Sequence, residues 1–524
     1  MQKFLPSLVL FVILSITLTA QPGALDTRFG KGGFVVTDAG TMNNSSGYDI
    51  VMLPNGKTVV SGKTEMSSSL VDAVLLRYNI NGSLDSSFGT NGMVLESFTN
   101  TFDNFSSVAL QPDGKLVVSG LSIRNDSFLV LFARYNANGK PDTSFRTKRT
   151  AVKYYGFGAV ATDVIVQPDK KILLLVNNNQ DITFKAQTQV ERYNEDGTLD
   201  STFGKKGNVT YTGDFWFTKF TIDNAGRIIC MSGDAGFTSL LRLKSNGAPD
   251  KSFGVNGIIT TRVSPYDGSA DLVAQADGKI VIGGFLQASN FVDNLFSVYR
   301  FNTNGTLDSS FNGTGINSTK ITGIDYTYDV ALQQDGKIVA TGFSIASNTT
   351  YITLMRYNKN GKTDLTWGKN GIDTVATVWK KGRYSYAVAS AVATDGSRIA
   401  VTGNQVAKNY AKNAFLTARF LLQANNIANT VAPSNVVVSQ NSHTVVYPNP
   451  VHNTTTVSFD LPKEDKINVL LLNAKGETVS VIFTGTLSSG KHNLPVDLSI
   501  VASGTYYVIV ETKIGTQHFK LIKL

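Results

Sequence analysis

Residues 328–342 read YDVALQQDGKIVATG, and residues 351–368 read YITLMRYNKNGKTDLTWG. With the apolar run that follows, they contain four short runs of β-forming residues, each bounded by Gly, Asn, Asp or Pro. This pattern predicts a four-stranded antiparallel meander. Gly336 follows Asp335 and supplies the positive φ angle that a tight hairpin requires. The stretch therefore predicts one compact β-sheet.

The same stretch recurs along the chain with a period in the fifties. An Asp followed three residues later by an aromatic ring occurs seven times. An Arg stands eight residues before every such Asp except the first, and a further Arg has no Asp after it. The Asp/aromatic pairs are Asp26/Phe29, Asp85/Phe88, Asp142/Phe145, Asp200/Phe203, Asp250/Phe253, Asp308/Phe311 and Asp364/Trp367, and the arginines are Arg77, Arg134, Arg192, Arg242, Arg300, Arg356 and Arg419. Such a period is typical of a repeat architecture.

Seven sheets that each bury two faces favour a radial arrangement with short edges. We therefore predict an all-β fold with a seven-bladed β-propeller of four-stranded blades; a β-solenoid, whose coils are usually shorter, is the alternative. The signatures LDSSFGTNG at residues 84–92 and QPDGK at residues 111–115 resemble the delta-60 repeats of bacterial secreted proteins. The resemblance covers residues 22–422. It implies a propeller and no established activity.

The repeat is out of phase with the chain ends. An orphan fourth strand over residues 33–38 precedes the first full unit, and the last unit stops after its third strand. We expect the N-terminal strand to complete the last blade and close the ring. Asp26 would then pair with Arg419 in bidentate geometry, as each later Asp pairs with its Arg. The alternative is that these Asp residues only form Asx-turns.

Composition narrows the function classes. The net charge of +9 is spread without basic runs, which argues against a nucleic-acid partner. Cys230 is the only cysteine, so no intramolecular disulfide can form. All four histidines follow residue 442, which excludes His-based triads and His-ligated metal sites from the repeat region.

Alternating strand direction places the recurring hairpins on one face and the variable connections on the opposite face. Loops on a rigid scaffold usually carry function, and rigid aromatic side chains suit sugar rings or a partner protein. The alternative is that these rings fill the gaps between blades. The predicted ligand-binding residues are Tyr154, Tyr155, Phe157, Trp216, Phe217, Tyr326, Tyr328, Tyr384 and Tyr386.

A second set of residues starts the presumed inner strands on the same face. Seven residues before the hairpin glycine stand four carboxylates, with Ser107, Lys219 and Ala389 in the other units. Four carboxylates at the mouth of the axial channel would suit a cation such as Ca²⁺ or acid–base chemistry. The alternative is that each merely caps a neighbouring strand. The predicted metal ligands are Asp49, Asp163, Asp271 and Asp329.

The first twenty residues predict an export signal. Lys3 precedes an apolar run from Leu8 to Leu18 that ends in small residues. The run is too short for a comfortable membrane span, so residues 1–20 are expected to be a cleaved signal peptide. The mature chain is then expected to lack a transmembrane anchor.

A second domain follows the repeats. Residues 423–442 contain no charged side chain and predict a linker, and residues 443–524 alternate as a small β-sandwich does. The motifs YPNP at 447–450, NAKG at 473–476, SGTY at 503–506 and the ending KLIKL resemble the C-terminal sorting domain of the type IX secretion system. The resemblance implies a Bacteroidota-type secretor, the secretion machinery as partner, and an extracellular or cell-surface location.

We therefore predict a secreted, non-catalytic binding or adhesion module that takes a glycan or protein ligand on its aromatic face. The alternatives are a carboxylate-based carbohydrate hydrolase or lyase, for which the Asp set is the only candidate, and a purely structural surface protein. Fold analogy alone does not decide among them.

Overall fold

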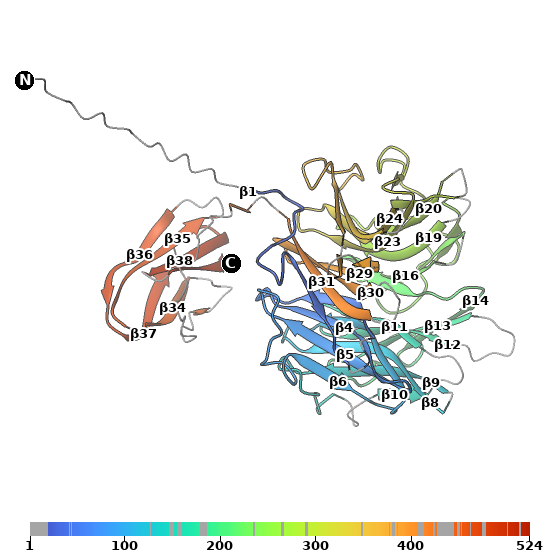
Figure 1. The fold of residues 1–524 in the computed structure, drawn as a ribbon, viewed down its shortest axis with the longest axis horizontal. Coiled ribbons are helices and arrows are strands. Elements are labelled where there is room, and N and C mark those ends of the chain that lie inside the picture. The colour runs from blue at the N-terminus through green and yellow to red at the C-terminus, as the bar shows by residue number, and fades with distance from the viewer. Residues whose placement is uncertain are drawn as a thin grey trace, which may run out of the picture. The chain divides into compact units, whose positions relative to one another are not determined.

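The computed structural model divides into two compact parts, Met1–Ala428 and Asn429–Leu524. All the secondary structure that it describes is β-strand (Figure 1). Within the described ranges, no helix has the length and apolar character that crossing a bilayer requires. The described residues are 19–422, 425–426, 445–447, 451 and 453–523, with gaps at 41, 43, 126, 146–150, 155–159, 179–185, 234–235, 264–266, 289–291, 347–348, 377, 380–382, 385, 407–412, 423–424, 462, 474–477, 500 and 513–514.

The described strands of the first part fall into seven four-stranded antiparallel units, and one parallel residue pair each joins units 1 and 2 and units 5 and 6 into eight-stranded sheets. Units 1 and 2 are β3 (Ser45–Met52), β4 (Thr58–Ser67), β5 (Leu70–Tyr78), β6 (Met93–Glu96), then β7 (Phe102–Leu110), β8 (Leu116–Arg124), β9 (Ser127–Tyr135), β10 (Ala151–Tyr154). Units 3 and 4 are β11 (Val160–Val166), β12 (Ile172–Asn178), β13 (Ala186–Tyr193), β14 (Asn208–Gly213), then β15 (Lys219–Ile222), β16 (Ile228–Ser232), β17 (Thr238–Leu243), β18 (Ile258–Thr261).

Units 5 and 6 are β19 (Asp267–Ala274), β20 (Ile280–Gln287), β21 (Asn294–Phe301), β22 (Ile316–Thr319), then β23 (Ile324–Leu332), β24 (Ile338–Ala346), β25 (Thr349–Tyr357), β26 (Ile372–Ala376). Unit 7 combines β29 (Tyr386–Thr394), β30 (Arg398–Val406) and β31 (Asn413–Leu421) with β2 (Phe34–Thr37), which pairs with β31 from Phe34 opposite Ala418 to Thr37 opposite Phe415. Two short ladders join β1 (Thr19–Ala20) to β32 (Asn425–Asn426) and β27 (Val378–Trp379) to β28 (Arg383–Tyr384).

The strand order within each unit follows the predicted meander. The first strand leads into the recurring hairpin, where Gly336 has φ +81°. In unit 3, where Lys170 replaces the glycine, we expect a looser turn from the sequence. Lys170 instead adopts φ +68° and keeps both hairpin hydrogen bonds, Gln167 N–H to Lys171 C=O at 2.8 Å and Lys170 N–H to Gln167 C=O at 2.9 Å. The hairpin is therefore as tight as the others, at a cost in backbone strain.

The core is divided into clusters that lie between neighbouring units. One cluster joins Phe132 of unit 2 to Leu174 of unit 3, and equivalent clusters join each following pair. Unit 7 also packs against unit 1, where Phe415 meets Val60. The first strands are neighbours in the series β3, β7, β11, β15, β19, β23 and β29, and β29 lies beside β3. Second strands are consequently buried on both faces, as β12 is along its whole length.

Each repeated Asp lies in a joint between two units. In unit 5, Arg300 Nε donates to Asp308 Oδ2 at 2.7 Å, and Ser310 donates to Asp308 Oδ1 through its backbone N–H and its hydroxyl. Arg300 Nη1 donates to the carbonyl of Lys359 in unit 6 at 2.6 Å. The predicted Arg–Asp pair and the Asx-turn therefore occur together. The pairing uses one carboxylate oxygen, so the expected bidentate geometry is wrong.

The other five internal joints repeat these contacts. In each, the Arg Nε reaches Oδ2 of the Asp, a Ser or Thr two residues after the Asp binds Oδ1, and the Arg Nη1 reaches a carbonyl of the next unit. The guanidinium also lies over the repeated ring, 4.6 Å from the centroid in the case of Arg300 and Phe311. Because the arginine binds both units, the repeated Arg–Asp–aromatic motif connects each unit to the next.

The joint between unit 7 and unit 1, which we call the seam joint, departs from this pattern. The predicted pair of Asp26 and Arg419 is present, with Nε at 3.0 Å and Nη2 at 2.8 Å from Oδ2. Arg28 stands where the other joints have Ser or Thr, and its Nε donates to Asp26 Oδ1 at 2.7 Å. Arg419 is rotated so that two of its nitrogens share one oxygen, and its Nη1 is buried without a hydrogen-bond partner.

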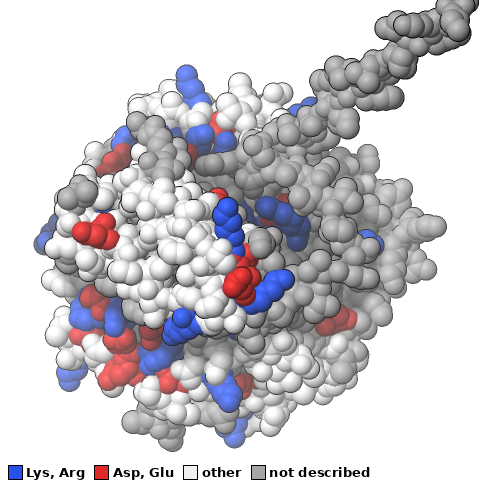
Figure 2. Space-filling model, turned by 90° about the vertical axis from the view of Figure 1, so that its left-hand side faces the viewer, with Lys and Arg blue, Asp and Glu red and all other residues white. Residues whose placement is uncertain are grey.

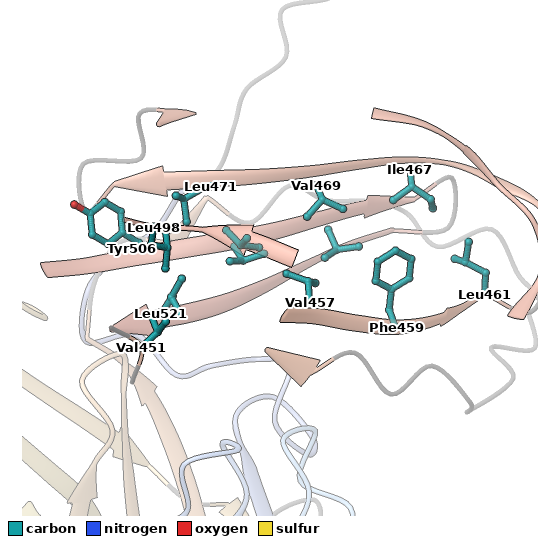
Figure 3. Close-up of a cluster of buried hydrophobic side chains, with 13 residues drawn as sticks. Val451, Val457, Phe459, Leu461, Ile467, Val469, Leu471, Leu498, Tyr506 and Leu521 are labelled. Atoms are coloured by element: carbon teal, nitrogen blue, oxygen red, sulfur yellow. The ribbon is translucent and has the colours of Figure 1, made fainter. Parts of the chain in front are cut away.

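The second part consists of two antiparallel sheets that share one core (Figure 3). One sheet has the order β33 (Val445–Tyr447), β34 (Thr454–Leu461), β37 (Gly490–Asp497), and the other β36 (Thr478–Leu487), β35 (Asp465–Asn473), β38 (Gly504–Thr512), β39 (Gly515–Lys523). Val457 and Phe459 from the first sheet face Val469 and Leu471 from the second. The predicted linker, residues 423–442, lies outside the described residues except for Asn425 and Asn426.

Candidate functional site

A cavity of about 680 Å³ opens on the face opposite the recurring hairpins. It is formed by the ends of strands in units 4 to 7. Its volume falls in the range of ordinary small-ligand sites, roughly 300–1,000 Å³. The lining residues are Gly233, Gly268, Ser269, Ala270, Phe285, Tyr326, Thr327, Tyr328, Ser390 and Asn404.

A β-bulge places one residue of each contributing first strand at this cavity. The register between first and second strand shifts by one between Ser269 and Asp271 and between Thr327 and Asp329. Ala270 and Tyr328 are the extra residues, and each lines the cavity. Bulges re-aim side chains and are frequent beside functional sites. Units 1, 2, 3 and 7 carry the same bulge, which sequence periodicity alone did not reveal.

Aromatic rings form one wall of the cavity. The Tyr326 ring stacks on Phe343 with centroids 5.0 Å apart and meets Phe285 edge-on at 4.8 Å. Tyr328 lies nearly parallel to Tyr326 at 6.4 Å and keeps 38% of its surface exposed. The buried Phe343 thus holds Tyr326, and Tyr328 offers ring surface to a ligand. Ser390 from unit 7 adds a polar group to the lining.

Each of the four predicted metal ligands directly follows the bulge residue of its first strand, and each binds the next unit. Asp49 Oδ2 accepts the backbone N–H of Val108 at 2.8 Å, and Asp329 Oδ2 accepts that of Val392 at 2.6 Å. Asp163 and Asp271 do the same, each with a backbone N–H of the following unit at 3.3 Å. We call these four residues the inner aspartates. They cap neighbouring strands, which is the alternative that the sequence left open.

The inner aspartates lie near one another without forming a cation site. Among the described residues, no group of three or more His, Cys, Asp or Glu is arranged to hold a metal ion. The predicted Ca²⁺ site at Asp49, Asp163, Asp271 and Asp329 therefore gains no support and stays a prediction, because the carboxylate oxygens are directed to backbone N–H groups of different units. In unit 7 the equivalent position is Ala391, because the hairpin glycine Gly396 follows it by five residues and not seven, and the predicted Ala389 is therefore two residues too early.

Burial shapes the charge of this set. Burial raises the pKa of Asp163 to about 6; the ammonium of Lys219 opposes the rise, and the charges of Asp49 and Asp271 add to it. Burial and a hydrogen bond with Asp271 raise the pKa of Asp329 well above its usual value. The carboxylates raise the pKa of Lys219 although burial lowers it. The cluster therefore favours one charged lysine and some protonated carboxyls.

The other predicted ligand residues are scattered. Trp216 lies in the connection between β14 and β15, 41% exposed, and does not line the cavity. Phe217 is fully buried among Phe220 and its neighbours, so its assignment to a ligand surface is wrong; the ring fills a gap between sheets. Tyr154, Tyr384 and Tyr386 lie in strands whose side chains are outside the described set, and Tyr155 and Phe157 are outside it entirely.

Charged residues do not form a single-sign region on the face in view in Figure 2. Lys and Arg side chains alternate there with Asp and Glu among the described residues. A nucleic-acid footprint would require a continuous basic surface. The visible face therefore agrees with the thinly spread charge in the sequence.

Two family models match parts of the chain. Residues 445–524 match the secretion system C-terminal sorting domain. Residues 53–88, 111–145, 275–311 and 333–366 match a β-propeller domain of unknown function (DUF5122). No curated protein matches the sequence.

Several solved structures are similar at low identity. PorZ, a surface component of the type IX secretion system of Porphyromonas gingivalis, is 12% identical with a TM-score of 0.31, covering 92% of this chain and 70% of PorZ. The polysaccharide lyase Uly1 is 11% identical with a TM-score of 0.42, covering 72% and 90%. An α-L-arabinofuranosidase of Fusarium graminearum is 11% identical with a TM-score of 0.34, covering 74% and 98%. Similarity at this level carries no functional argument.

The family matches and the sheets together define a secreted β-propeller protein. Its C-terminal domain is a type IX sorting domain, which directs the chain to the cell surface or the extracellular space.

Proposed function

We propose that the seven units form one closed, seven-bladed propeller, completed by β2 after residues 1–20 leave as a signal peptide. Three contacts support closure: the ladder of β2 with β31, the packing of Phe415 against Val60, and the pairing of Asp26 with Arg419. Closure gives the axial face a fixed shape, because every unit is held by two neighbours.

We further propose that this propeller is a non-catalytic binding module that takes a glycan at the cavity lined by Tyr326 and Tyr328. The observation that carries the proposal is the cavity of about 680 Å³ with a stacked aromatic wall. A saccharide presents apolar C–H faces and hydroxyl groups, and this cavity offers ring faces beside polar groups of Ser390 and Asn404.

An enzymatic function has weaker support. Glycosidases of the usual kind hold two carboxyl groups roughly 5–9.5 Å apart around the scissile bond. Asp271 and Asp329 instead bond to each other and to backbone N–H groups, so they bind structure rather than substrate. A purely structural surface protein would not require a ligand-sized cavity.

A glycan array probed with the purified full chain tests the proposal. For any glycan that binds, Tyr328→Ala is expected to weaken binding at least tenfold by calorimetry, because it removes the exposed ring. Tyr507→Ala is the matched control, since Tyr507 is also 38% exposed but lies in the C-terminal domain. Trp216→Ala tests whether the ligand extends along the face. Release of reducing sugar from the bound glycan would support the enzyme instead, and binding unchanged by Tyr328→Ala would reject the cavity.

A further inference from the structure

The two sheets of the C-terminal sandwich present very different outer faces. In the three-stranded sheet, the strand β37 turns His492, Leu494 and Val496 toward the core and exposes the residues between them. Those exposed residues are Lys491, Asn493, Pro495 and Asp497. This is the polar-out alternation expected of an antiparallel sheet with one solvated face.

The four-stranded sheet breaks that alternation. Its inward residues, such as Val469 and Leu471, are fully buried, as in Figure 3. The outer face is polar at one end, where Asn468 Nδ2 donates to Glu511 Oε2 at 3.3 Å. Beyond this pair the outward residues are apolar, and strand register places them side by side: Leu470 lies opposite both Val481 and Ile509, and Leu472 lies opposite Tyr507. We call the partly exposed members the outer patch: Leu470, Leu472, Val481, Tyr507 and Ile522, with the buried Ile509 between them.

The outer patch contains exposed apolar side chains that the folding of the sandwich does not require. Val481 is 58% exposed, and Tyr507 and Ile522 are each 38% exposed. Val481 lies on β36, the edge strand of its sheet, where proteins usually place Lys or Pro to prevent pairing with other chains. The core of the sandwich is complete on the other side of the sheet. An apolar face on an edge strand therefore indicates a partner.

We propose that the outer patch is the surface through which the sorting domain docks on a protein of the type IX export machinery. The inference rests on the sorting-domain match and is independent of glycan binding by the propeller. Five partly exposed side chains, beside the buried Ile509, offer on the order of a few hundred Å². Each subunit of a stable dimer buries about 800 Å². The patch suits a partner that binds during transit and releases the chain, not a permanent second copy.

The test is export of the full-length chain from a bacterium that has a type IX system. Val481→Lys combined with Tyr507→Lys is expected to reduce the amount outside the cell at least tenfold and to leave the chain in the periplasm. Asn493→Lys adds the same charge to the polar outer face of the other sheet, and its export is expected to match that of the wild type. Thermal melting of each purified chain establishes that the sandwich is folded. Where the double lysine variant melts early, Val481→Ser with Tyr507→Ser replaces it.

Each result decides the proposal. Normal export of a folded patch variant would overturn it. So would a wild-type dimer that the variant converts to monomer, which would make the patch a self-interface. Binding of the wild type, but not of the variant, to phosphatidylethanolamine–phosphatidylglycerol vesicles would assign the patch to the membrane and also overturn it. Glycan binding is expected to be unchanged in the patch variants, so failure here is distinguishable from failure of the propeller proposal.

Discussion

The repeat region holds two sets of aspartates that connect the same units by different means. The outer set, from Asp85 to Asp364, sits in joints where each carboxylate meets an arginine and, in most units, a lysine. The inner set has no basic group within ion-pair distance among the described residues and accepts backbone N–H groups instead. Both sets tie one unit to the next.

The two sets differ in the charge state that the fold prefers. At Asp142, burial raises the pKa, but hydrogen bonds from Ser144 and Lys115 and the charge of Arg134 outweigh it and lower the pKa to about 2. At Asp163, burial dominates and the pKa rises to about 6. Of these two aspartates, the one paired with an arginine and a lysine is thus stabilised as an anion, and the one held by backbone N–H groups is not. The motif with arginine marks the first case.

The largest expected effect comes from removing an outer carboxylate. Asp308→Ala leaves Arg300 buried and unpaired and is expected to lower the free energy of unfolding by about 3–5 kcal/mol. Asp26→Ala is expected to cost a similar amount, because Arg419 is only 2% exposed. Chemical denaturation of the full chain measures both. A seam variant as stable as the wild type beside a destabilised Asp308→Ala would refute ring closure through Asp26.

An isosteric change sharpens the comparison. Asp308→Asn removes the charge that Arg300 and Lys279 require and is expected to cost about 2–3 kcal/mol. Asp329→Asn replaces a carboxyl whose pKa is already raised with a neutral group of the same shape, so a change within about 1 kcal/mol is expected at pH 7. The same denaturation assay decides. Equal losses in the two variants would show that the inner aspartates also depend on charge.

The sequence predicted the partners of the outer set, whereas for the inner set it left cation binding and strand capping both open, for a physical reason. When one side chain binds another, both residue types recur in every repeat of the sequence, as Arg300 and Asp308 do at a spacing of eight residues. The partner of Asp329 is the backbone N–H of Val392, which every residue but proline has, so no letter marks it. The cavity was not predicted for a similar reason. A register shift at Tyr328 decides which side chains meet there, and no residue type marks that shift in the sequence. Phe217 was misassigned because aromatic letters do not distinguish a buried ring from an exposed one.

The two sets predict opposite responses to pH. The unfolded pKa of Asp is about 3.9. The native state therefore holds the Asp163 proton more tightly, and this contribution to stability is present below about pH 4 and lost as pH rises through about 6. For Asp142 the contribution is present above about pH 4 and lost as pH falls through about 2.

Thermal melting from pH 2 to pH 7.5 tests this difference. Relative to the wild type, Asp163→Asn is expected to gain stability between pH 4 and pH 6, by at most about 1.4 kcal/mol per pH unit for one proton. Asp142→Asn is expected to differ most from the wild type above pH 4 and to approach it at pH 2. Parallel curves for Asp163→Asn and the wild type would contradict the raised pKa.

The smallest expected effect concerns the seam joint, which lacks the Ser or Thr hydroxyl of the internal joints. Arg28 occupies the place of Ser310, and Arg419 consequently leaves Nη1 buried without a partner. Arg28→Ser would free Arg419 to turn as Arg300 does, so that Nη1 can reach a carbonyl of unit 1. The lost pair is worth little because the Arg28 side chain is 59% exposed. We expect a net gain of about 0.5–1 kcal/mol in unfolding free energy. Ser310→Arg, which transplants the seam into an internal joint, is expected to lose about as much. If neither variant changes the free energy of unfolding, the hydroxyl does not set the orientation of the guanidinium, and the seam joint differs from the internal joints in sequence only.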